Sequence, residues 1–247
     1  MVIATPIWRS RPTDSENAFL RRTDRTNQEV DRWLCAPDDL DVGFYARKFP
    51  DWRIQRYPKQ AFTSVTAYSK WLTAPDFYRS VDAYEFVTIC QLDAVLIKDI
   101  TGVDMLGIDY LGSPWVPPIK VLTVGTRIYV ASTCDGEHGM WVTQRLGRSL
   151  RVGNGGLSIR RVEAHITAAE WLTHKVPERY RDHTLEDVLL CAFASRTGMR
   201  IALADFAEQV FMETSAATLK SIPDIYGFHA LQRWNPGLAK RLTEENV

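Results

Sequence analysis

Several features that would place a chain in a class at once are missing from this sequence. No run of about 18 apolar residues occurs, so a transmembrane helix is not expected. The N-terminus lacks the basic start and long apolar region of a secretory signal peptide. The four cysteines include no Cys-x-x-Cys pair, and Cys90 and Cys191 lie in apolar runs, which favours small buried side chains over disulfides or zinc ligands. These absences favour a cytoplasmic protein and leave peripheral contact with the inner face of a membrane open.

An excess of charge of one sign is also absent. Thirty basic residues balance thirty acidic ones, so the formal net charge is zero. Nonspecific binding to nucleic acid depends on an excess of Lys and Arg, so no nucleic-acid partner is expected. The sequence contains no Gly-x-Ser-x-Gly, His-Glu-x-x-His or Gly-Lys-Ser/Thr motif, which argues against common hydrolase, zinc-protease and P-loop sites. With 45% hydrophobic residues in 247, the chain can bury the core of one α/β domain.

The first third of the chain has patterns typical of alternating strands and helices. Residues 2–8 predict a buried first strand, and residues 14–34 predict a helix, either continuous or broken, with a strongly polar face. A second strand is expected near residues 52–57. Residues 63–79 have apolar side chains at helical spacing, with Pro75 starting a second helix.

The rest of the chain continues this alternation. Phe86–Cys90 is a continuous apolar run and predicts a central parallel strand buried on both faces. Residues 107–118 predict a short strand and a rigid turn, residues 119–150 an insertion containing a hairpin, and residues 152–159 a glycine-rich turn that leads into a strand. Helices follow at about 161–173 and 184–197. The fold class is therefore α/β, with a mixed, mostly parallel central sheet flanked by helices.

Asp93 and Gln91 follow the strand Phe86–Cys90 directly. Open α/β sheets bind ligands at the carboxyl ends of their strands. A carboxylate at that position is costly unless it is paired or binds a cation, and Mg²⁺ or Mn²⁺ prefers such oxygen ligands. An Asp that caps a neighbouring helix is the structural alternative.

Three further segments have a functional and a structural interpretation each. Gly153-Asn154-Gly155-Gly156 lets the backbone approach a ligand closely or forms a tight turn. Glu186-Asp187 supplies a general base or completes a helix cap with Thr184. His229, after a glycine and an aromatic residue, is a ligand or a structural histidine.

Taken in order, these segments resemble a known family. A strand that ends in an Asp motif, a glycine-rich turn, Glu-Asp at a helix start and a late His is the order found in GT-A glycosyltransferases. The chain resembles, more specifically, a bacterial and fungal family of glycosyltransferase-like domains of unknown function. The resemblance spans about residues 62–230 and is carried by Gln-x-Asp, Asp-Tyr-x-Gly-x-Pro-Trp at Asp109–Trp115 and Gly-Asn-Gly-Gly-x-Ser-x-Arg at Gly153–Arg160. The first 60 residues match only in general character.

The resemblance implies a donor site. Asp93 matches the last acid of the Asp-x-Asp motif, whose Mn²⁺ or Mg²⁺ holds the diphosphate of a nucleotide-sugar donor, and His229 matches a late His that completes the metal site. Gln91 stands where the first acid usually lies and offers only a neutral oxygen. Gly155 and Gly156, with Asn154 beside them, match the glycine-rich loop near the donor sugar and the acceptor.

The resemblance also implies a catalytic site and a division of the chain. Asp187 matches the general base of inverting members, with Glu186 beside it. In the mechanism we then expect, the metal or a basic group such as Arg160 or Arg233 stabilises the departing diphosphate. Residues 1–247 would form a single GT-A-like, Rossmann-like domain. Its residues 1–100 would be the nucleotide-binding half, and residues 101–247 the acceptor-binding half with the insertion at 119–150.

The function implied is transfer of a sugar from a nucleotide-sugar donor to a hydroxyl of a glycan or lipid-linked acceptor, with inversion, in bacterial surface-polysaccharide synthesis. One alternative is a noncatalytic GT-A-like domain that binds glycans or nucleotides in a polysaccharide-assembly complex, which Gln91 would suit. A nucleotidyltransferase is a second alternative, because it also places acids at strand ends. The released product, nucleoside diphosphate or pyrophosphate, separates the two kinds of enzyme.

Overall fold

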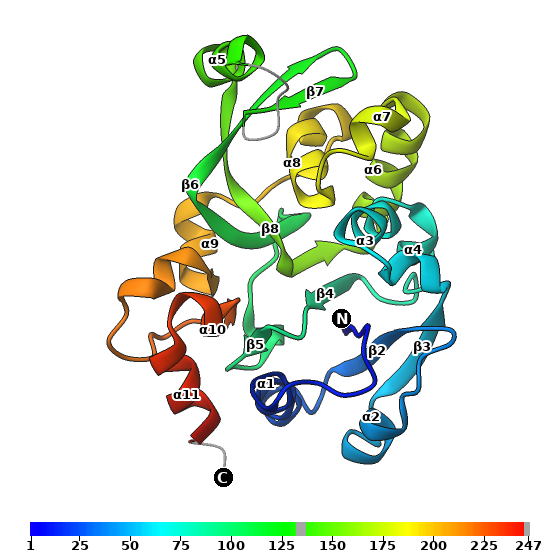
Figure 1. Cartoon of the computed structure of the whole chain (residues 1–247), viewed down its shortest axis with the longest axis vertical. Coiled ribbons are helices and arrows are strands. Elements are labelled where there is room, and N and C mark those ends of the chain that lie inside the picture. The colour runs from blue at the N-terminus through cyan, green and yellow to red at the C-terminus, as the bar shows by residue number, and fades with distance from the viewer. Residues whose placement is uncertain (132–136, 245–247) are drawn as a thin grey trace.

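A seven-stranded sheet runs through the computed structural model, which describes residues 1–131 and 137–244 (Figure 1). Its strand order is β3-β2-β1-β4-β8-β6-β7. The first four strands are parallel, and β8, β6 and β7 join antiparallel to β4 and to one another. The strands are β1 (Val2–Pro6), β2 (Asp31–Pro37), β3 (Arg53–Tyr57), β4 (Phe86–Cys90), β6 (Tyr110–Val124), β7 (Arg127–Val130) and β8 (Arg148–Arg161). The expected α/β class with a mixed sheet is confirmed.

Helices cover both faces of this sheet. On β1, Val2 and Ala4 pack in a cluster with α3, α4 and α6, whereas Ile3 between them packs in a different cluster. This strand is therefore buried on both sides, as a central parallel strand must be. The helices are α1 (Asp14–Thr26), α2 (Gly43–Lys48), α3 (Val65–Leu72), α4 (Pro75–Arg79), α5 (Glu137–Leu146), α6 (Val162–Lys175), α7 (Glu178–Arg181), α8 (Glu186–Thr197), α9 (Ala204–Val210), α10 (Leu231–Trp234) and α11 (Pro236–Glu244).

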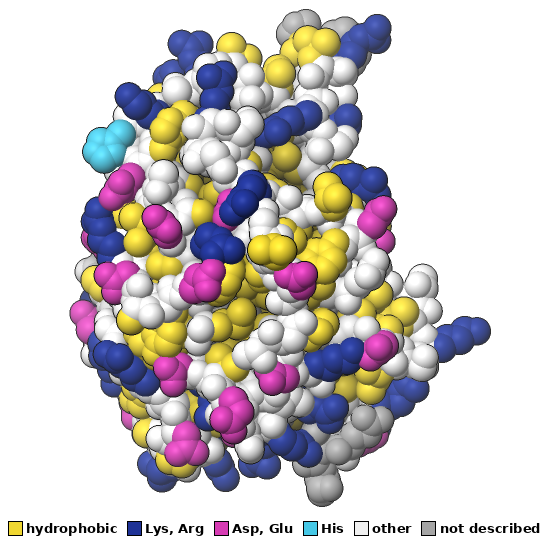
Figure 2. All heavy atoms as spheres, turned by 180° about the vertical axis from the view of Figure 1, so that it is seen from behind, with side chains coloured by type: hydrophobic (Ala, Val, Ile, Leu, Met, Phe, Trp, Pro, Cys, Tyr) yellow, Lys and Arg dark blue, Asp and Glu magenta, His cyan; other side chains and the backbone are white. Residues whose placement is uncertain are grey.

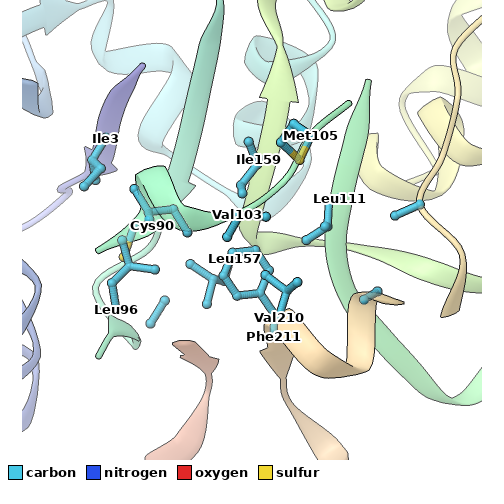
Figure 3. Close-up of a cluster of buried hydrophobic side chains, with 14 of the residues drawn as sticks. Ile3, Cys90, Leu96, Val103, Met105, Leu111, Leu157, Ile159, Val210 and Phe211 are labelled. Atoms are coloured by element: carbon cyan, nitrogen blue, oxygen red, sulfur yellow. The ribbon is translucent and has the colours of Figure 1, made fainter. Parts of the chain in front are cut away.

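A second, three-stranded sheet has the order β5-β10-β9, formed by β5 (Ala94–Leu96), β10 (Gly227–His229) and β9 (Phe211–Met212). One hydrophobic cluster joins the two sheets: Figure 3 shows Leu157 of β8 beside Val210 and Phe211, with Cys90 and Leu96 in the same cluster. Cys90 is thus a small buried side chain, as expected. Because one core holds both sheets, the ends of β4, β8 and β10 are fixed relative to each other.

The helix expected over residues 14–34 is shorter than the pattern indicated. It ends at Thr26, where Asn27 donates from its side-chain amide to the carbonyls of Thr23 and Lys98 and accepts from the N–H of Ile100. Residues 31–37 form β2 instead, because pairing with β1 and β3 buries their apolar side chains. This tertiary pairing outweighs local helical spacing.

The glycine-rich segment also differs from expectation. Residues 153–156 lie within the long strand β8 rather than in a turn. The pairing of β6 with β8 shifts register at Gly112, Ser113 and Pro114, so both strands are irregular here. β-Bulges of this kind bend a strand and redirect its side chains, often next to active sites. Of the prolines expected to form a rigid turn, Pro114 pairs with Val152 of β8, and Pro117 and Pro118 lie in the stretch of β6 between the paired residues Pro114 and Ile119.

Of the segment expected as an insertion, residues 119–131 and 137–150 form the outer end of the β6–β7 hairpin, α5 and the start of β8, which project together at one end of the molecule (Figure 1); residues 132–136 lie outside the described residues. On the opposite face from that of Figure 1, hydrophobic side chains gather across the middle, with basic and acidic side chains interspersed around them (Figure 2). In the part of the chain that the structure describes, no helix combines the length and the apolar character that crossing a membrane requires.

Candidate functional site

The polar residues singled out in the sequence meet where β4, β8, β10 and α8 come together. Gln91, just after β4, donates its backbone N–H to the carbonyl of Gly156 on β8 at 2.9 Å. Antiparallel pairing of β5 with β10 places His229 opposite Ala94, and the N–H of Ala230 donates to the carbonyl of Asp93 at 3.0 Å. Segments that lie far apart in the sequence are thereby held together through backbone hydrogen bonds.

Glu186 and Asp187 begin α8 and point into this junction. Asp187 is 7% exposed; its carboxylate accepts from the N–H of Gly155 at 3.1 Å and from the N–H of Val188 at 2.7 Å. Leu185, not Thr184, is the N-cap residue, and its side chain makes no capping hydrogen bond, so the expected capping alternative does not form. Both acids make other contacts instead of a Thr184 cap.

The two carboxylates differ in their surroundings. Burial raises the pKa of Asp187 to about 7, with the neighbouring Glu186 carboxylate adding to the effect and the N–H groups of Gly155 and Val188 opposing it. Glu186 is occupied: one oxygen accepts from Arg160 at 3.3 Å and the other from Ser69 at 3.1 Å. Asp187 is therefore a carboxyl group that can exchange a proton near neutral pH, whereas both oxygens of Glu186 are engaged by Arg160 and Ser69.

Arg160 lies beneath the site. Its side chain is fully buried, and its guanidinium donates to the hydroxyls of Ser158 and Tyr78, to the carbonyl of Gly155 and to Glu186. The expectation that Arg160 contacts a donor diphosphate does not fit this burial, because every donor direction of the guanidinium faces protein. The sequence could not show this, because a basic residue at the end of a glycine-rich motif gives the same pattern whether its side chain faces the ligand site or the protein core.

Gly155 and Gly156 are explained by their neighbours. A Cβ on Gly155 would lie 2.3 Å from Glu186 Oε1, and a Cβ on Gly156 would lie 2.1 Å from His229 Nε2. Neither glycine has a positive φ, so the reason is space and not backbone conformation. Two consecutive glycines thus let an acidic residue of α8 and the imidazole of β10 approach one strand closely.

His229 lies between two carboxylates. Its Nε2 is 3.5 Å from Asp93 Oδ1, and its Nδ1 is 3.5 Å from Glu213 Oε1. Burial alone would lower the pKa of His229, but the two carboxylates outweigh it and raise the pKa to about 9. At neutral pH and without a cation the imidazole is therefore charged, and a cation bound to Nε2 would have to displace a proton.

The protein groups at this site suit a cation that is held mainly by the phosphates of a bound substrate. Among residues 1–131 and 137–244, no three His, Cys, Asp or Glu side chains gather as a metal cage. Mg²⁺ is typically bound by one or two protein groups together with substrate phosphates and waters. Asp93, which is half-exposed, and His229 fit that pattern, with Asp93 supplying the oxygen and His229 Nε2 the second ligand.

A cavity of 460 Å³ opens beside these groups at the carboxyl end of β1. Its wall is lined by Pro6, Trp8, Phe62, Thr63, Ser64, Val65, Tyr68 and Gln91. Gln91, expected to stand in for a metal-binding acid, therefore faces the cavity and neighbours Tyr68. An aromatic-lined cavity with a few polar groups is the usual form of a small-molecule site.

Sequence reasoning missed Glu213, Tyr68, Ser69 and Trp8. Glu213 carried no signal, because it follows a two-residue strand and belongs to no motif. Tyr68 and Ser69 are one helical turn from the start of α3, and only packing against α8 brings Ser69 to Glu186. Trp8 gave only a weak signal, as an aromatic residue at the end of the predicted first strand, and the structure leaves it 46% exposed there.

Gly156→Ala should destabilise the fold by about 1–3 kcal/mol, because the methyl group overlaps the imidazole of His229 and forces it or β8 to move. Urea unfolding monitored by circular dichroism measures this. Gly237→Ala is the matched control: its nearest neighbour would be 3.8 Å away, so its stability should stay within about 1 kcal/mol of the wild type. Equal stability of the two variants would contradict the packing of His229 against Gly156.

Comparison with known proteins agrees with this architecture. The galactosyltransferase LgtC, solved in complex with donor and acceptor sugar analogs, superposes with a TM-score of 0.60 at 11% identity, covering 99% of this chain and 94% of LgtC. Mouse xyloside xylosyltransferase 1 gives a TM-score of 0.56 at 10% identity, over 95% of this chain and 99% of that enzyme. GlyE of Streptococcus pneumoniae gives 0.54 at 15% identity, over 98% of this chain and 59% of GlyE. These likenesses show a GT-A glycosyltransferase fold.

A search of the curated proteins gives no match. The family model described as "Protein of unknown function (DUF5672)" matches residues 51–225, which is most of the chain and includes Asp93, Gly156, Asp187 and Glu213. The chain is therefore a member of the DUF5672 family, and its fold is that of the GT-A glycosyltransferases.

Proposed function

We propose that this protein is a glycosyltransferase that moves a sugar from a nucleotide-sugar donor to a hydroxyl of its acceptor. One observation carries the proposal: adjacent glycines of β8 hold two different chemical groups. Gly155 donates to the buried carboxylate of Asp187, and Gly156 packs against His229, which faces Asp93. Asp187, a base with a pKa near neutral pH, therefore contacts one glycine, and the pair His229 and Asp93, which suits a diphosphate-bound cation, adjoins the next glycine.

The donor would bind at the carboxyl ends of β1 and β4. The aromatic-lined 460 Å³ cavity, with Trp8 and Tyr68 in its wall, offers stacking surfaces for a nucleoside. Asp93 and His229 would hold Mn²⁺ or Mg²⁺, which when bound neutralises charge on the diphosphate. Arg233, exposed on α10 four residues after His229, is the basic group we assign to the departing diphosphate in place of the buried Arg160.

In the chemical step, Asp187 acts as the general base, because its pKa of about 7 lets it take up a proton near neutral pH. Its carboxylate takes the proton of an acceptor hydroxyl as that oxygen attacks the anomeric carbon, and the bond from that carbon to the diphosphate oxygen breaks. One in-line displacement inverts the anomeric centre. Asp187 is the base and Glu186 a supporting group, because Arg160 and Ser69 already occupy both oxygens of Glu186.

The division of labour along the chain is part of the proposal. Residues 1–100 would supply most of the nucleotide site and residues 101–247 the acceptor site, with residues 119–150 at its outer end. His229 is the exception, since it comes from the second half to complete the donor site. The glycan or lipid-linked acceptor and a role in bacterial surface-polysaccharide synthesis rest on the family resemblance.

Incubation with a panel of nucleotide sugars and Mn²⁺ should release a nucleoside diphosphate, faster with a hydroxyl acceptor than with water alone. Chromatography of the nucleotides measures this, and proton NMR of the product reads its anomeric configuration. Pyrophosphate formed from a sugar phosphate and a nucleoside triphosphate would instead indicate a nucleotidyltransferase. Donor binding without any turnover across the panel would indicate a noncatalytic binding domain.

A further inference from the structure

Glu213 lies beside His229, directly after the last paired residue of β9. Short β9 runs parallel to β10, with Phe211 beside Gly227 and Met212 beside Phe228. Glu213 and His229 are the residues that follow Met212 and Phe228 in the sequence, and Glu213 Oε1 lies 3.5 Å from His229 Nδ1. Both side chains are almost enclosed, at 13% and 11% exposure. Their contact therefore depends on the backbone and not on two mobile surface side chains.

The second oxygen of Glu213 is held as well. The side-chain amide of Asn154 donates to Glu213 Oε2, and Asn154 Oδ1 accepts from the N–H of Gly156 at 3.0 Å. Asn154 was expected to contact the donor, but both ends of its amide are engaged inside the protein. A chain of contacts thus runs from the backbone of β8 through Asn154 and Glu213 to His229.

The imidazole of His229 needs such a partner. Both of its nitrogens are buried, and neither makes a hydrogen bond of good geometry. A neutral imidazole offers a lone pair at one nitrogen only when the other carries the hydrogen, and the group beside that other nitrogen decides which one it is. A carboxylate beside Nδ1 selects the form whose free lone pair is on Nε2, the nitrogen that faces Asp93.

We propose that Glu213 is a positioning residue: it holds the Nδ1–H of His229 so that Nε2, together with Asp93, binds the divalent cation of the donor complex. Asn154 in turn fixes the Glu213 carboxylate. Ligating histidines commonly donate their second N–H to a carboxylate, and loss of such a partner typically costs 10–100-fold in metal affinity. This inference rests on the proposed function for its cation but makes a separate claim about Glu213.

Binding of Mn²⁺ to the protein in the presence of saturating uridine diphosphate, followed by electron paramagnetic resonance of the protein-bound ion, tests the claim. Glu213→Gln should weaken Mn²⁺ binding about 10–100-fold. Glu208→Gln, an exposed acid on α9, is the matched control and should bind as the wild type does. Asn154→Ala keeps Glu213 but removes the hydrogen bond that fixes its carboxylate, so it should weaken Mn²⁺ binding by a smaller factor. This variant provides the test if Glu213→Gln does not fold.

Kinetics separate positioning from a merely structural role. The Mn²⁺ concentration for half-maximal transfer should rise in Glu213→Gln by the same factor as the dissociation constant, while kcat at saturating Mn²⁺ stays within about 3-fold, since excess cation compensates for lost affinity. Wild-type Mn²⁺ affinity in Glu213→Gln, or no Mn²⁺ binding by the wild type, would overturn the inference. Absence of transfer by a wild type that binds Mn²⁺ would overturn the proposed function and leave the inference standing.

Discussion

Asp187→Asn is expected to lower the rate of sugar transfer by about 10²–10⁴-fold, the usual contribution of a general base. The substitution keeps the shape of the side chain, and its remaining oxygen can still accept from the N–H of Gly155 or of Val188. Donor affinity should therefore stay close to that of the wild type. Turnover measured at saturating donor and acceptor, with donor affinity from calorimetry, gives both quantities.

The pH dependence of transfer provides a second measure of the same group. Asp187 must be ionised to act as a base, and burial beside Glu186 raises its pKa to about 7. The rate should therefore rise about tenfold per pH unit below pH 7 and level off above it. Asp205→Asn, an exposed acid on α9, is the matched control and should keep the wild-type profile. Near-normal turnover of Asp187→Asn, or a rate independent of pH between 5 and 8, would rule out Asp187 as the base.

Arg160→Met is expected to destabilise the fold by about 3–5 kcal/mol, because it leaves the buried Glu186 carboxylate without its cation. A domain of this size has a free energy of unfolding of roughly 5–15 kcal/mol, so the loss is large. The hydroxyls of Tyr78 and Ser158 lose a hydrogen-bond partner as well. Urea unfolding at pH 7.5 measures the change.

A double variant separates the ion pair from general packing. Arg160→Met with Glu186→Gln removes both charges and should recover a substantial part of the loss, since a neutral pair pays no cost for an uncompensated buried charge. Lys59→Met breaks a surface ion pair with Asp39 whose partners are 58% and 59% exposed, and it should cost less than about 1 kcal/mol. A loss under 1 kcal/mol in Arg160→Met would show that the buried pair is not a main support of the site.

Local patterns determined much of this protein. The apolar run Phe86–Cys90 predicted the buried strand β4, and the polar residues after it predicted a site at its carboxyl end, because strand direction and burial are readable from neighbouring residues. The order of Asp93, the glycines, Glu186-Asp187 and His229 indicated the GT-A fold that the superpositions show. The roles of these residues in binding and catalysis stay predictions.

Only the tertiary structure decided which atoms face each other. Residues 31–37 form a strand because β1 and β3 pair with them on both sides. The side chain of Arg160 is buried because it forms an ion pair with Glu186, which is distant in the sequence. Glu213 belongs to no motif, and it lies beside His229 because two very short strands pair directly before these residues. The expected role of Gly155 and Gly156 near a donor stays a prediction, whereas the structure shows that Glu186 and His229 leave no space for a Cβ at either position. Periodicity and spacing record the neighbours of a residue along the chain, whereas burial, ion pairing and steric fit depend on residues that folding brings from elsewhere.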